Sequence, residues 1–366
     1  MKRTVAVIGC GMIANCAHIP AFRRMPESFR LVAVCDVREQ AARDTAAKFG
    51  IPAYYTDEER MLAEVRPQVV VICSPNGQHK AHVMLALRHG AHVLCEKPIA
   101  TNYADAAEMY GYAKEQGLLL VACQCWRYIP ERLAAKKAID EGLVGPIYYG
   151  EMTHIRRRGI PTWGKFHIKE FSGGGAFLDI GVHVLDSALW LLGNPKVKSV
   201  SAVMHKVHTD ETGSLASSGA LTSAVSHARP FNPEEMDVES FSSGTVRFEN
   251  GGSLAFKVAW AANMAEENTL RLSGTKGGVD TEKGVLYAGK KGETPLAVEP
   301  ERFPDEAFYG HFYIVENLAA ALDGREELMI RPEESINVSA VLEAAYRSAA
   351  LGREVQMEEI LNSATE

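Results

Sequence analysis

A glycine-rich turn near the amino terminus constrains the fold of this chain more than any other feature. Residues Gly9-Cys10-Gly11-Met12-Ile13-Ala14 follow the apolar run 4–8 and precede a helical pattern. In this G-x-G-x-x-A form, the first glycine allows a tight turn, the second lets a pyrophosphate approach the backbone, and the small third residue lets the helix pack on the strand. The helix N-terminus also favours phosphate. We therefore predict a dinucleotide site at Gly9, Gly11, Met12 and Ile13.

The first 125 residues alternate short apolar runs with helical patterns. Runs that are nearly continuous in apolar residues are typical of strands buried on both faces, and strands alternating with helices predict a doubly wound parallel sheet. Gly50, Gly90 and Gly117 stand where helical patterns stop, as left-handed C-caps would, and Thr56 with Glu59 has the form of a capping box. The predicted strands are 4–9, 31–36, 68–74, 92–96 and 118–124.

After residue 125 the predicted pattern changes from alternating strands and helices to consecutive strands with few helices between them. Helices are predicted over 130–141 and about 176–192, and Asn250-Gly251-Gly252 between two strands indicates a hairpin. Consecutive strands of this kind predict an α+β domain on a mostly antiparallel sheet. Its predicted strands are 146–158, 198–208, 244–249, 253–260 and 269–273.

The length of 366 residues favours two domains. We place a Rossmann domain over 1–125 and an α+β substrate domain over 126–366. A C-terminal helix over about 333–351 is expected to pack back toward the first domain. The stretch 209–235, rich in Ser, Ala, Thr and Pro, is expected to form a long loop.

Composition excludes several classes of function. Hydrophobic residues make up 46% and charged residues 23%, as in an ordinary globular protein. The net charge is −7, and positive and negative residues are scattered along the sequence. This distribution gives no electrostatic basis for binding the phosphates of a nucleic acid. No apolar run reaches the roughly 18 residues of a transmembrane helix. We expect a soluble protein with neither a nucleic-acid nor a membrane partner.

The seven cysteines all fall within the first 125 residues of the chain, and their number is odd. This pattern is typical of reduced thiols in a cytoplasm rather than of a disulfide framework. Cys123 and Cys125 stand too close together for the usual zinc or redox spacings. His79 and His82 have no third ligand at a sensible spacing. We therefore predict a cytoplasmic protein without a metal site.

Asp36 closes the second predicted strand, where the adenosine ribose of a dinucleotide would lie. A carboxylate there accepts hydrogen bonds from the ribose hydroxyls and repels a 2′-phosphate, so NAD is favoured over NADP. Arg38, two residues later, could instead pair with a phosphate, and a solvated arginine is the alternative interpretation.

Three further segments carry a family resemblance. They are Ser74-Pro75-Asn76-Gly77-Gln78-His79, Cys95-Glu96-Lys97-Pro98 and Gly173-Gly174-Gly175-Ala176-Phe177-Leu178-Asp179-Ile180-Gly181-Val182-His183. With the glycine turn, this chain resembles the Gfo/Idh/MocA family, which includes glucose–fructose oxidoreductase and inositol dehydrogenase. The resemblance implies an NAD(P)-dependent oxidoreductase that acts on a carbinol carbon of a sugar or polyol. It departs most in the 209–235 stretch.

The resemblance implies that Lys97, Asp179 and His183 meet at the nicotinamide as the catalytic residues. The positions of these residues in the sequence are consistent with that role. Lys97 follows a strand at the carboxyl edge of the sheet, and one helical face presents Asp179, His183 and then Asp186. Histidine is the natural base for the hydroxyl proton, and Lys97 would hold the substrate oxygen. The sequence leaves open which of the two takes the proton. In the alternative, His183 is a packed histidine and Lys97 a solvated lysine.

The same resemblance implies cofactor contacts from the turns after the third and fourth strands. The expected residues are Ser74, Asn76, His79, Glu96 and Lys97, with His82 on an ordinary helix surface.

Substrate contacts are expected from two segments rich in arginine and aromatic residues. Arginine forks and aromatic faces suit a hydroxyl-rich, possibly anionic carbohydrate. Alternating arginines on a strand could equally mark a solvated face, and His311 is a weaker candidate. The predicted substrate-binding residues are Arg127, Tyr128, Arg156, Arg158, Trp163 and His183.

Other functions and assembly states stay open at this point. An NAD-using, glycosidase-like enzyme with transient oxidation, or a non-catalytic sensor of dinucleotide or sugar, would use the same fold. The alternating apolar residues of the 253–260 strand predict an exposed apolar sheet face, and hence a homodimer or homotetramer. The residues expected on that face are Leu254, Phe256, Val258 and Trp260.

Overall fold

The structure of the chain is a computed structural model that describes residues 2–207, 231–289, 293–297 and 308–364. Most of the predicted loop 209–235 lies outside the described residues. Its last part is described, and there Pro233–Glu235 form the short 3-10 helix η7.

Six parallel strands form the sheet of the first domain, in the order β3-β2-β1-β4-β5-β6. This confirms the predicted doubly wound sheet. The order reverses direction between β1 and β4, and ligands of such folds bind outside the carboxyl ends of the strands at this point. The strands are β1 (Arg3–Ile8), β2 (Phe29–Cys35), β3 (Ala53–Tyr55), β4 (Val69–Ile72), β5 (His92–Cys95) and β6 (Leu120–Ala122).

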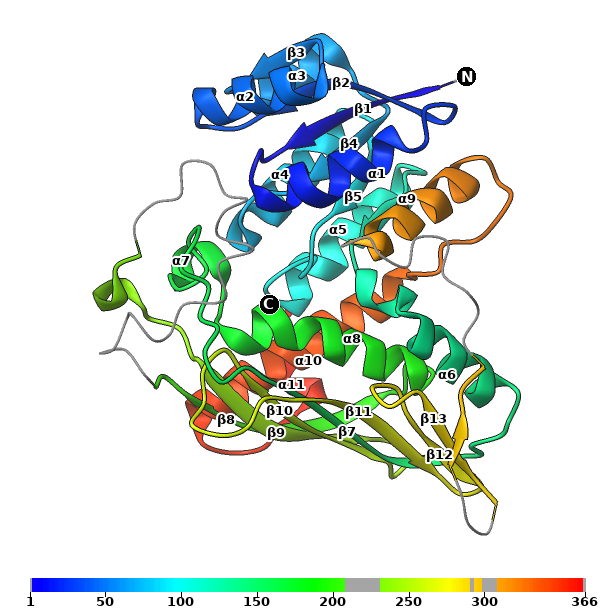
Figure 1. The fold of residues 1–366 in the computed structure, drawn as a ribbon. Coiled ribbons are helices and arrows are strands. Elements are labelled where there is room, and N and C mark those ends of the chain that lie inside the picture. Colours follow the sequence, from blue (N-terminus) through cyan, green and yellow to red (C-terminus); the bar gives the residue numbers. More distant parts are fainter. Residues whose placement is uncertain (1, 208–230, 290–292, 298–307, 365–366) are drawn as a thin grey trace.

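Helices cover both faces of this sheet (Figure 1). Gly50, Gly90 and Gly117 have φ angles of 66°, 77° and 66°, which confirms the left-handed caps. The predicted capping box was wrong by one residue, because Asp57 rather than Thr56 caps α3 and accepts from the Arg60 amide at 2.8 Å. The helical segments are the π-helical η1 (Ala14–His18), α1 (Ile19–Arg23), α2 (Glu39–Phe49), α3 (Glu58–Val65), η2 (Asn76–Gln78), α4 (His79–Arg88) and α5 (Tyr103–Glu115).

The second sheet has nine strands in the order β14-β13-β12-β11-β7-β10-β9-β8-β15. Only β7 and β10 pair in parallel, so the sheet is mostly antiparallel, as predicted. The strands are β7 (Ile147–Ile155), β8 (Val197–His205), β9 (Phe241–Phe248), β10 (Ser253–Ala259), β11 (Glu267–Gly274), β12 (Gly277–Asp280), β13 (Val285–Ala288), β14 (Glu293–Pro295) and β15 (Val355–Gln356).

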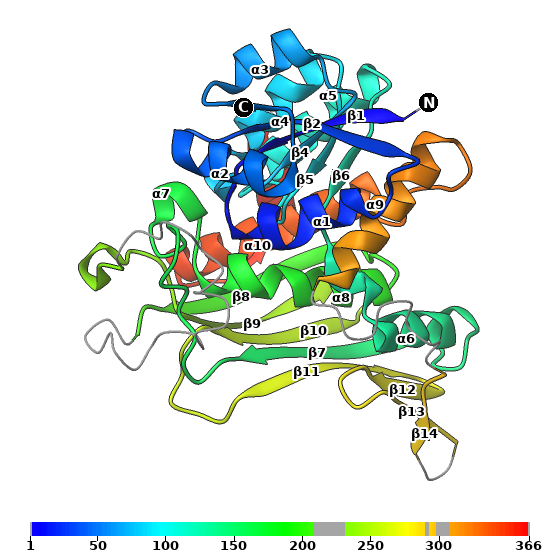
Figure 2. The same ribbon diagram turned by 45° about the horizontal axis from the view of Figure 1, so that its top comes forward.

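Of the helices in the second half, those over 182–191 and 332–351 lie between the two sheets (Figures 1 and 2), whereas the helix over 309–322 packs on the core of the first domain. The Tyr103 amide at the start of α5 donates to Glu343 Oε2 on α10 at 2.8 Å, which ties the last long helix to the first sheet's layer. These segments are η3 (Cys125–Tyr128), α6 (Pro130–Asp140), α7 (Lys169–Ser172), the π-helical η4 (Phe177–Gly181), α8 (Val182–Leu191), α9 (Tyr309–Leu322), α10 (Pro332–Leu351), α11 (Met357–Leu361) and η8 (Asn362–Ala364).

The apolar face of β10 is not exposed, contrary to the prediction. Leu254, Phe256, Val258 and Trp260 are all buried, and the Phe256 ring stacks on Phe177 of η4 with centroids 4.6 Å apart. A period of two groups these residues on one face but does not say which face the helices cover. The open face carries Ser253, Ala255 and Lys257 instead, each partly exposed.

Candidate functional site

Lys97 and Asp179 meet where the two domains face each other. Lys97 follows β5 at the carboxyl edge of the parallel sheet, and its ammonium donates to the Asp179 carbonyl oxygen at 2.7 Å and to Asp179 Oδ1 at 3.0 Å. The other carboxylate oxygen, Oδ2, accepts from the buried Trp260 indole at 2.9 Å. Asp179 lies in η4, and π-helical turns recur at functional sites.

The charge of Asp179 is stabilised by these partners. Burial alone raises the pKa of a carboxyl group. At Asp179 the Lys97 ammonium and the hydrogen bonds from Lys97 and Trp260 outweigh burial, and its pKa lies below the ordinary value. Asp179 is therefore ionised at neutral pH and forms an ion pair with Lys97.

Close backbone packing sets the start of the helix that carries Asp179. A Cβ on Gly175 would lie 1.8 Å from the Glu239 carbonyl oxygen, so only glycine fits there. The buried Glu239 carboxylate accepts from the Gly175 amide at 2.8 Å and the Phe177 amide at 2.9 Å, which satisfies two of the free amides at the helix start. The glycine-rich segment thus lets η4 begin against β9.

His183 follows one turn later on the same helix. Its ring stacks on Trp126 with centroids 4.6 Å apart and planes 15° apart, and Nδ1 has no hydrogen-bond partner within the described part of the chain. Burial, followed by the Lys97 charge, lowers the pKa of His183 below its ordinary value. The imidazole is therefore neutral at pH 7 and able to accept a proton.

His154 is a site residue that the sequence interpretation missed. It lies on β7, with its ring centroid 5.4 Å from that of Trp126. Burial first, and then the Arg156 charge and His183, lower its pKa to about 3. The alternation of β7 puts His154 and Arg156 on one face, and this was the available signal.

A cavity of about 300 Å³ lies at the end of β7 and is lined by His154. Of the predicted substrate residues, Arg156 lines it directly, whereas Arg158 donates to Asn263 Oδ1 at 2.9 Å. Trp163 is buried and packs edge-on against Phe166. The lining residues are His154, Ile155, Arg156, Glu266, Glu267 and Asn268.

The glycine turn has the form that a dinucleotide pyrophosphate requires. Gly9 has φ = 96°, and a Cβ there would lie 2.6 Å from the Cys73 backbone. A Cβ on Gly11 would meet nothing within 4 Å, so open space lies beside the start of the helix that contains Met12 and Ile13. The residues present therefore fit a bound dinucleotide.

Asp36 stands directly after β2, next to this turn. Its carboxylate accepts from the Cys10 amide at 2.9 Å, the Arg38 amide at 2.9 Å and Arg38 Nε at 3.0 Å. Burial opposes ionisation, but the hydrogen bonds from Arg38 and Cys10 lower the pKa of Asp36 below its ordinary value. The predicted alternatives for Arg38 were a phosphate contact or solvent, and the structure pairs it with Asp36.

The turn after β4 lies against the second domain. Asn76 Nδ2 donates to the Ser172 carbonyl at 2.9 Å, and the Ser74 hydroxyl lies 2.8 Å from His82 Nδ1. His79 does not face a cofactor as predicted, because it is buried with its two ring nitrogens 2.7 and 3.0 Å from the backbone carbonyls of Pro98 and Ser74. His82 is partly buried rather than on an ordinary helix surface.

Two predicted substrate residues belong to the protein interior instead. Arg127 is fully buried, with Nε and Nη2 bonded to the Asp186 carboxylate at 2.7 and 2.6 Å and Nη1 bonded to Glu334. Tyr128 is buried and stacks on Tyr313. Neither side chain is available to a substrate, and Asp186 turns toward Arg127 and not toward Lys97.

Glu96 is likewise committed to protein partners. Its Oε1 lies 2.6 Å from His18 Nε2 and 3.4 Å from His311 Nε2, and its Oε2 accepts from the Lys97 amide at 3.1 Å. The weaker substrate candidate His311 is thus buried against Glu96.

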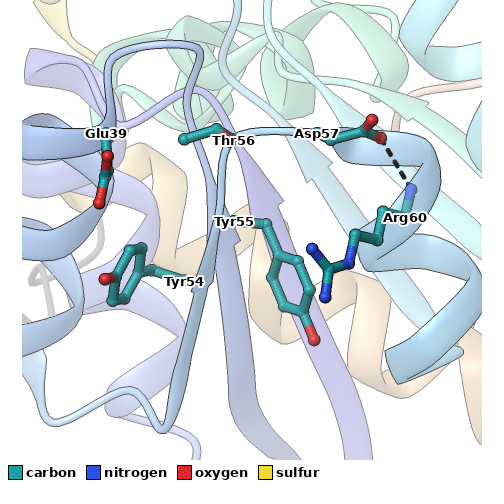
Figure 3. A pocket seen from close by; sticks show the side chains of 6 residues that line it. All are labelled: Glu39, Tyr54, Tyr55, Thr56, Asp57 and Arg60. Atoms are coloured by element: carbon teal, nitrogen blue, oxygen red, sulfur yellow. Dashed lines mark hydrogen bonds between the residues drawn. The ribbon is translucent and has the colours of Figure 1, made fainter.

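A second hollow of about 300 Å³ lies at the outer edge of the first sheet (Figure 3). Its polar groups bond to each other or to near neighbours, since Arg60 Nε and the Tyr55 hydroxyl both donate to Glu64. It holds none of the residues gathered around Lys97. Its lining is Glu39, Tyr54, Tyr55, Thr56, Asp57 and Arg60.

The chain is similar over most of its length to known dehydrogenases. A D-glucoside 3-dehydrogenase of Escherichia coli (strain K12) is 32% identical over 96% of this chain and 97% of its own length. A levoglucosan dehydrogenase of Pseudarthrobacter phenanthrenivorans is 27% identical over 75% of this chain and 72% of its own length. The crystal structure of GenD2 from gentamicin A biosynthesis, in complex with NAD, superposes with a TM-score of 0.76 at 26% identity, covering 97% of this chain and 96% of that chain.

Family assignment rests on matches to both halves of the chain. Residues 133–280 match the family's C-terminal domain, and residues 3–123 match an oxidoreductase family described as having an NAD-binding Rossmann fold. None of the helices described here is long and apolar enough to cross a membrane. The chain therefore belongs to the Gfo/Idh/MocA family of NAD-binding oxidoreductases.

Proposed function

We propose that this protein is an NAD-dependent dehydrogenase that oxidises a secondary hydroxyl of a sugar, sugar derivative or polyol. The observation that carries the proposal is the pairing of a cationic Lys97 with Asp179 at the carboxyl edge of the parallel sheet, one helical turn from a neutral His183. The 32% identity to a D-glucoside 3-dehydrogenase supports a pyranoside as the first substrate to test.

The chain's own residues divide the chemistry between them. Bound NAD⁺ supplies the acceptor for the hydride that leaves the carbinol carbon. Lys97 donates a hydrogen bond to the substrate oxygen and stabilises negative charge as the hydroxyl proton leaves. His183 accepts that proton, because Lys97 is already protonated in its ion pair while the imidazole is neutral. Asp179 holds Lys97 in place, and Trp126 supports the His183 ring by stacking.

The cavity lined by His154 and Arg156 supports a substrate rich in hydroxyl groups. His154 is neutral and can donate or accept a hydrogen bond, Arg156 donates only, and Glu266 and Glu267 accept. A mixture of donors and acceptors in one cavity matches the hydroxyl groups around a sugar ring better than it matches an apolar ligand.

The proposal is tested with purified protein and a panel of D-glucosides, free aldoses, polyols and uronic acids. We expect NADH absorbance to rise with at least one member when NAD⁺ is supplied, and to rise less with NADP⁺. Cleavage of an aryl glycoside without net NADH would instead establish the glycosidase-like alternative. Tight NADH binding with no turnover of any member would favour the sensor.

We also propose that the chain forms a homodimer or homotetramer through the open face of the nine-stranded sheet. This face carries the partly exposed side chains of β10 and Tyr149 of β7, and no helix covers it in the part of the chain drawn in Figure 2. Light scattering at micromolar concentration measures the assembly state. A monomer would contradict the proposal.

A further inference from the structure

Four potential metal ligands converge next to the catalytic pair. They are His18 from η1, Glu96 after β5, Cys123 after β6 and His311 in the first turn of α9. One donor atom from each lies within 4.8 Å of the other three, and all four side chains are buried. The residues come from four separate segments, so no local spacing in the sequence brings them together.

The cluster is poorly satisfied by hydrogen bonds alone. Glu96 Oε1 is shared between His18 Nε2 at 2.6 Å and His311 Nε2 at 3.4 Å. The outward ring nitrogens, His18 Nδ1 and His311 Nδ1, have no hydrogen-bond partner within the described part of the chain, and Cys123 is a free thiol. Buried polar groups are nearly always paired, so two imidazoles that share one carboxylate oxygen at 0% and 4% exposure form an unusual cluster that a bound cation would explain.

The donor set matches the chemistry of one metal ion in particular. Two imidazoles, a thiolate and a carboxylate are all zinc ligands, and structural zinc sites are closed and four-coordinate. The two anionic ligands would balance the charge of Zn²⁺ inside the protein. Tetrahedral coordination separates the donor atoms by about 3.3–3.7 Å, so the His18–Glu96 contact would lengthen and the longest separations in the cluster would shorten.

We propose that His18, Glu96, Cys123 and His311 form a structural zinc site that fastens α9 to the first domain. Glu96 contributes Oε1 to the metal, while Oε2 keeps its hydrogen bond from the Lys97 amide. The metal thereby fixes the backbone that carries Lys97, but it touches neither the substrate nor the hydride path. Metal binding deprotonates Cys123 and releases that proton to solvent.

The site is tested by measuring metal content, independently of any activity. Untagged protein from zinc-supplemented cultures should hold about one zinc per chain by mass spectrometry, as a closed four-ligand site would. Cys123→Ser and His311→Ala should lose most of it. Cys16→Ser and His89→Ala, which change the same residue types outside the cluster, should keep it. Cobalt-substituted wild type should show a thiolate-to-cobalt absorption band that Cys123→Ser lacks.

Two results would overturn the proposal. One is wild-type protein that holds no stoichiometric zinc as purified and takes up neither zinc nor cobalt on dialysis. The other is zinc that both cluster variants retain in full, since it would then bind elsewhere. The wild-type cobalt spectrum needs no variant, so the proposal stays testable even if a variant misfolds.

Discussion

We propose that Asp36 sets the choice of cofactor, so Asp36→Ala should weaken the preference for NAD over NADP. In the structure the carboxylate accepts from Arg38 Nε at 3.0 Å and Nη2 at 3.2 Å. Removing the carboxylate eliminates the acceptor for the ribose hydroxyls and the repulsion of a 2′-phosphate. It also releases the Arg38 guanidinium, which can then pair with that phosphate.

The size of the effect follows from the surroundings of the pair. A hydrogen bond to a charged group contributes about 1.5–3 kcal/mol, which NAD binding would lose. The Asp36 side chain is 8% exposed but its partner Arg38 is 49% exposed, so solvent screens the interaction of these charges with a 2′-phosphate. We therefore take roughly 1 kcal/mol for this electrostatic contribution, the upper end for exposed ion pairs. Together these terms shift the NAD-to-NADP preference by about 10²–10³-fold.

The assay needs no identified substrate, because dissociation constants for NADH and NADPH can be measured by fluorescence titration. Asp36→Asn is the matched control, since it keeps an oxygen acceptor for the Cys10 amide but removes the charge, and we expect an intermediate shift. Asp36→Ala combined with Arg38→Ala should lose the gain in NADPH affinity without recovering NADH affinity. An unchanged ratio of the two constants in Asp36→Ala would refute the reasoning.

Three further predictions concern catalysis and stability. His183→Ala should reduce kcat by about 10²–10⁴-fold as a lost general base while leaving NADH affinity nearly intact, with the exposed His89→Ala as control; near-native kcat would exclude His183 as the base. Because burial and Lys97 lower the pKa of His183 from 6.5, kcat/KM should stay level as pH falls through 6.5 and decline only below it; a decline centred above pH 6.5 would contradict this. Arg127→Met leaves Asp186 buried without its partner and should cost about 3–5 kcal/mol in urea denaturation, whereas the exposed Arg30→Met should change stability by less than about 0.5 kcal/mol.

The sequence predicted best the strands that are buried on both faces of the sheet, because burial on both faces makes the strand itself an apolar run. All four residues of β4 are buried, so its composition alone indicates a central parallel strand. The strand β3 was missed because its three residues are partly or fully exposed and give no apolar run. β15 has only two residues and pairs with β8, far away in sequence, so no local signal marks it.

The site divides in the same way between local and tertiary determinants. The spacing of Asp179 and His183 predicts a shared helical face, but their roles came from the family resemblance. Trp260 could not be assigned from sequence, because its hydrogen bond to Asp179 depends on tertiary packing. For His154 the alternation of β7 gives a shared face with Arg156, but its position beside Trp126 depends on how β7 packs on η3.

Arg127 shows why a charged residue near a predicted site is easily misassigned. Charged side chains are rarely fully buried, so an arginine after the last strand of the first domain is reasonably read as a ligand contact. Within α8, at 3.6 residues per turn, Asp186 lies about 60° from His183 around the helix axis. That rotation is enough to turn Asp186 from the site toward η3, where Trp126 stacks on His183 and the next residue, Arg127, pairs with Asp186. Adjacent residues of one short turn therefore serve the site and the core, and only the packing of η3 on α8 determines which does which.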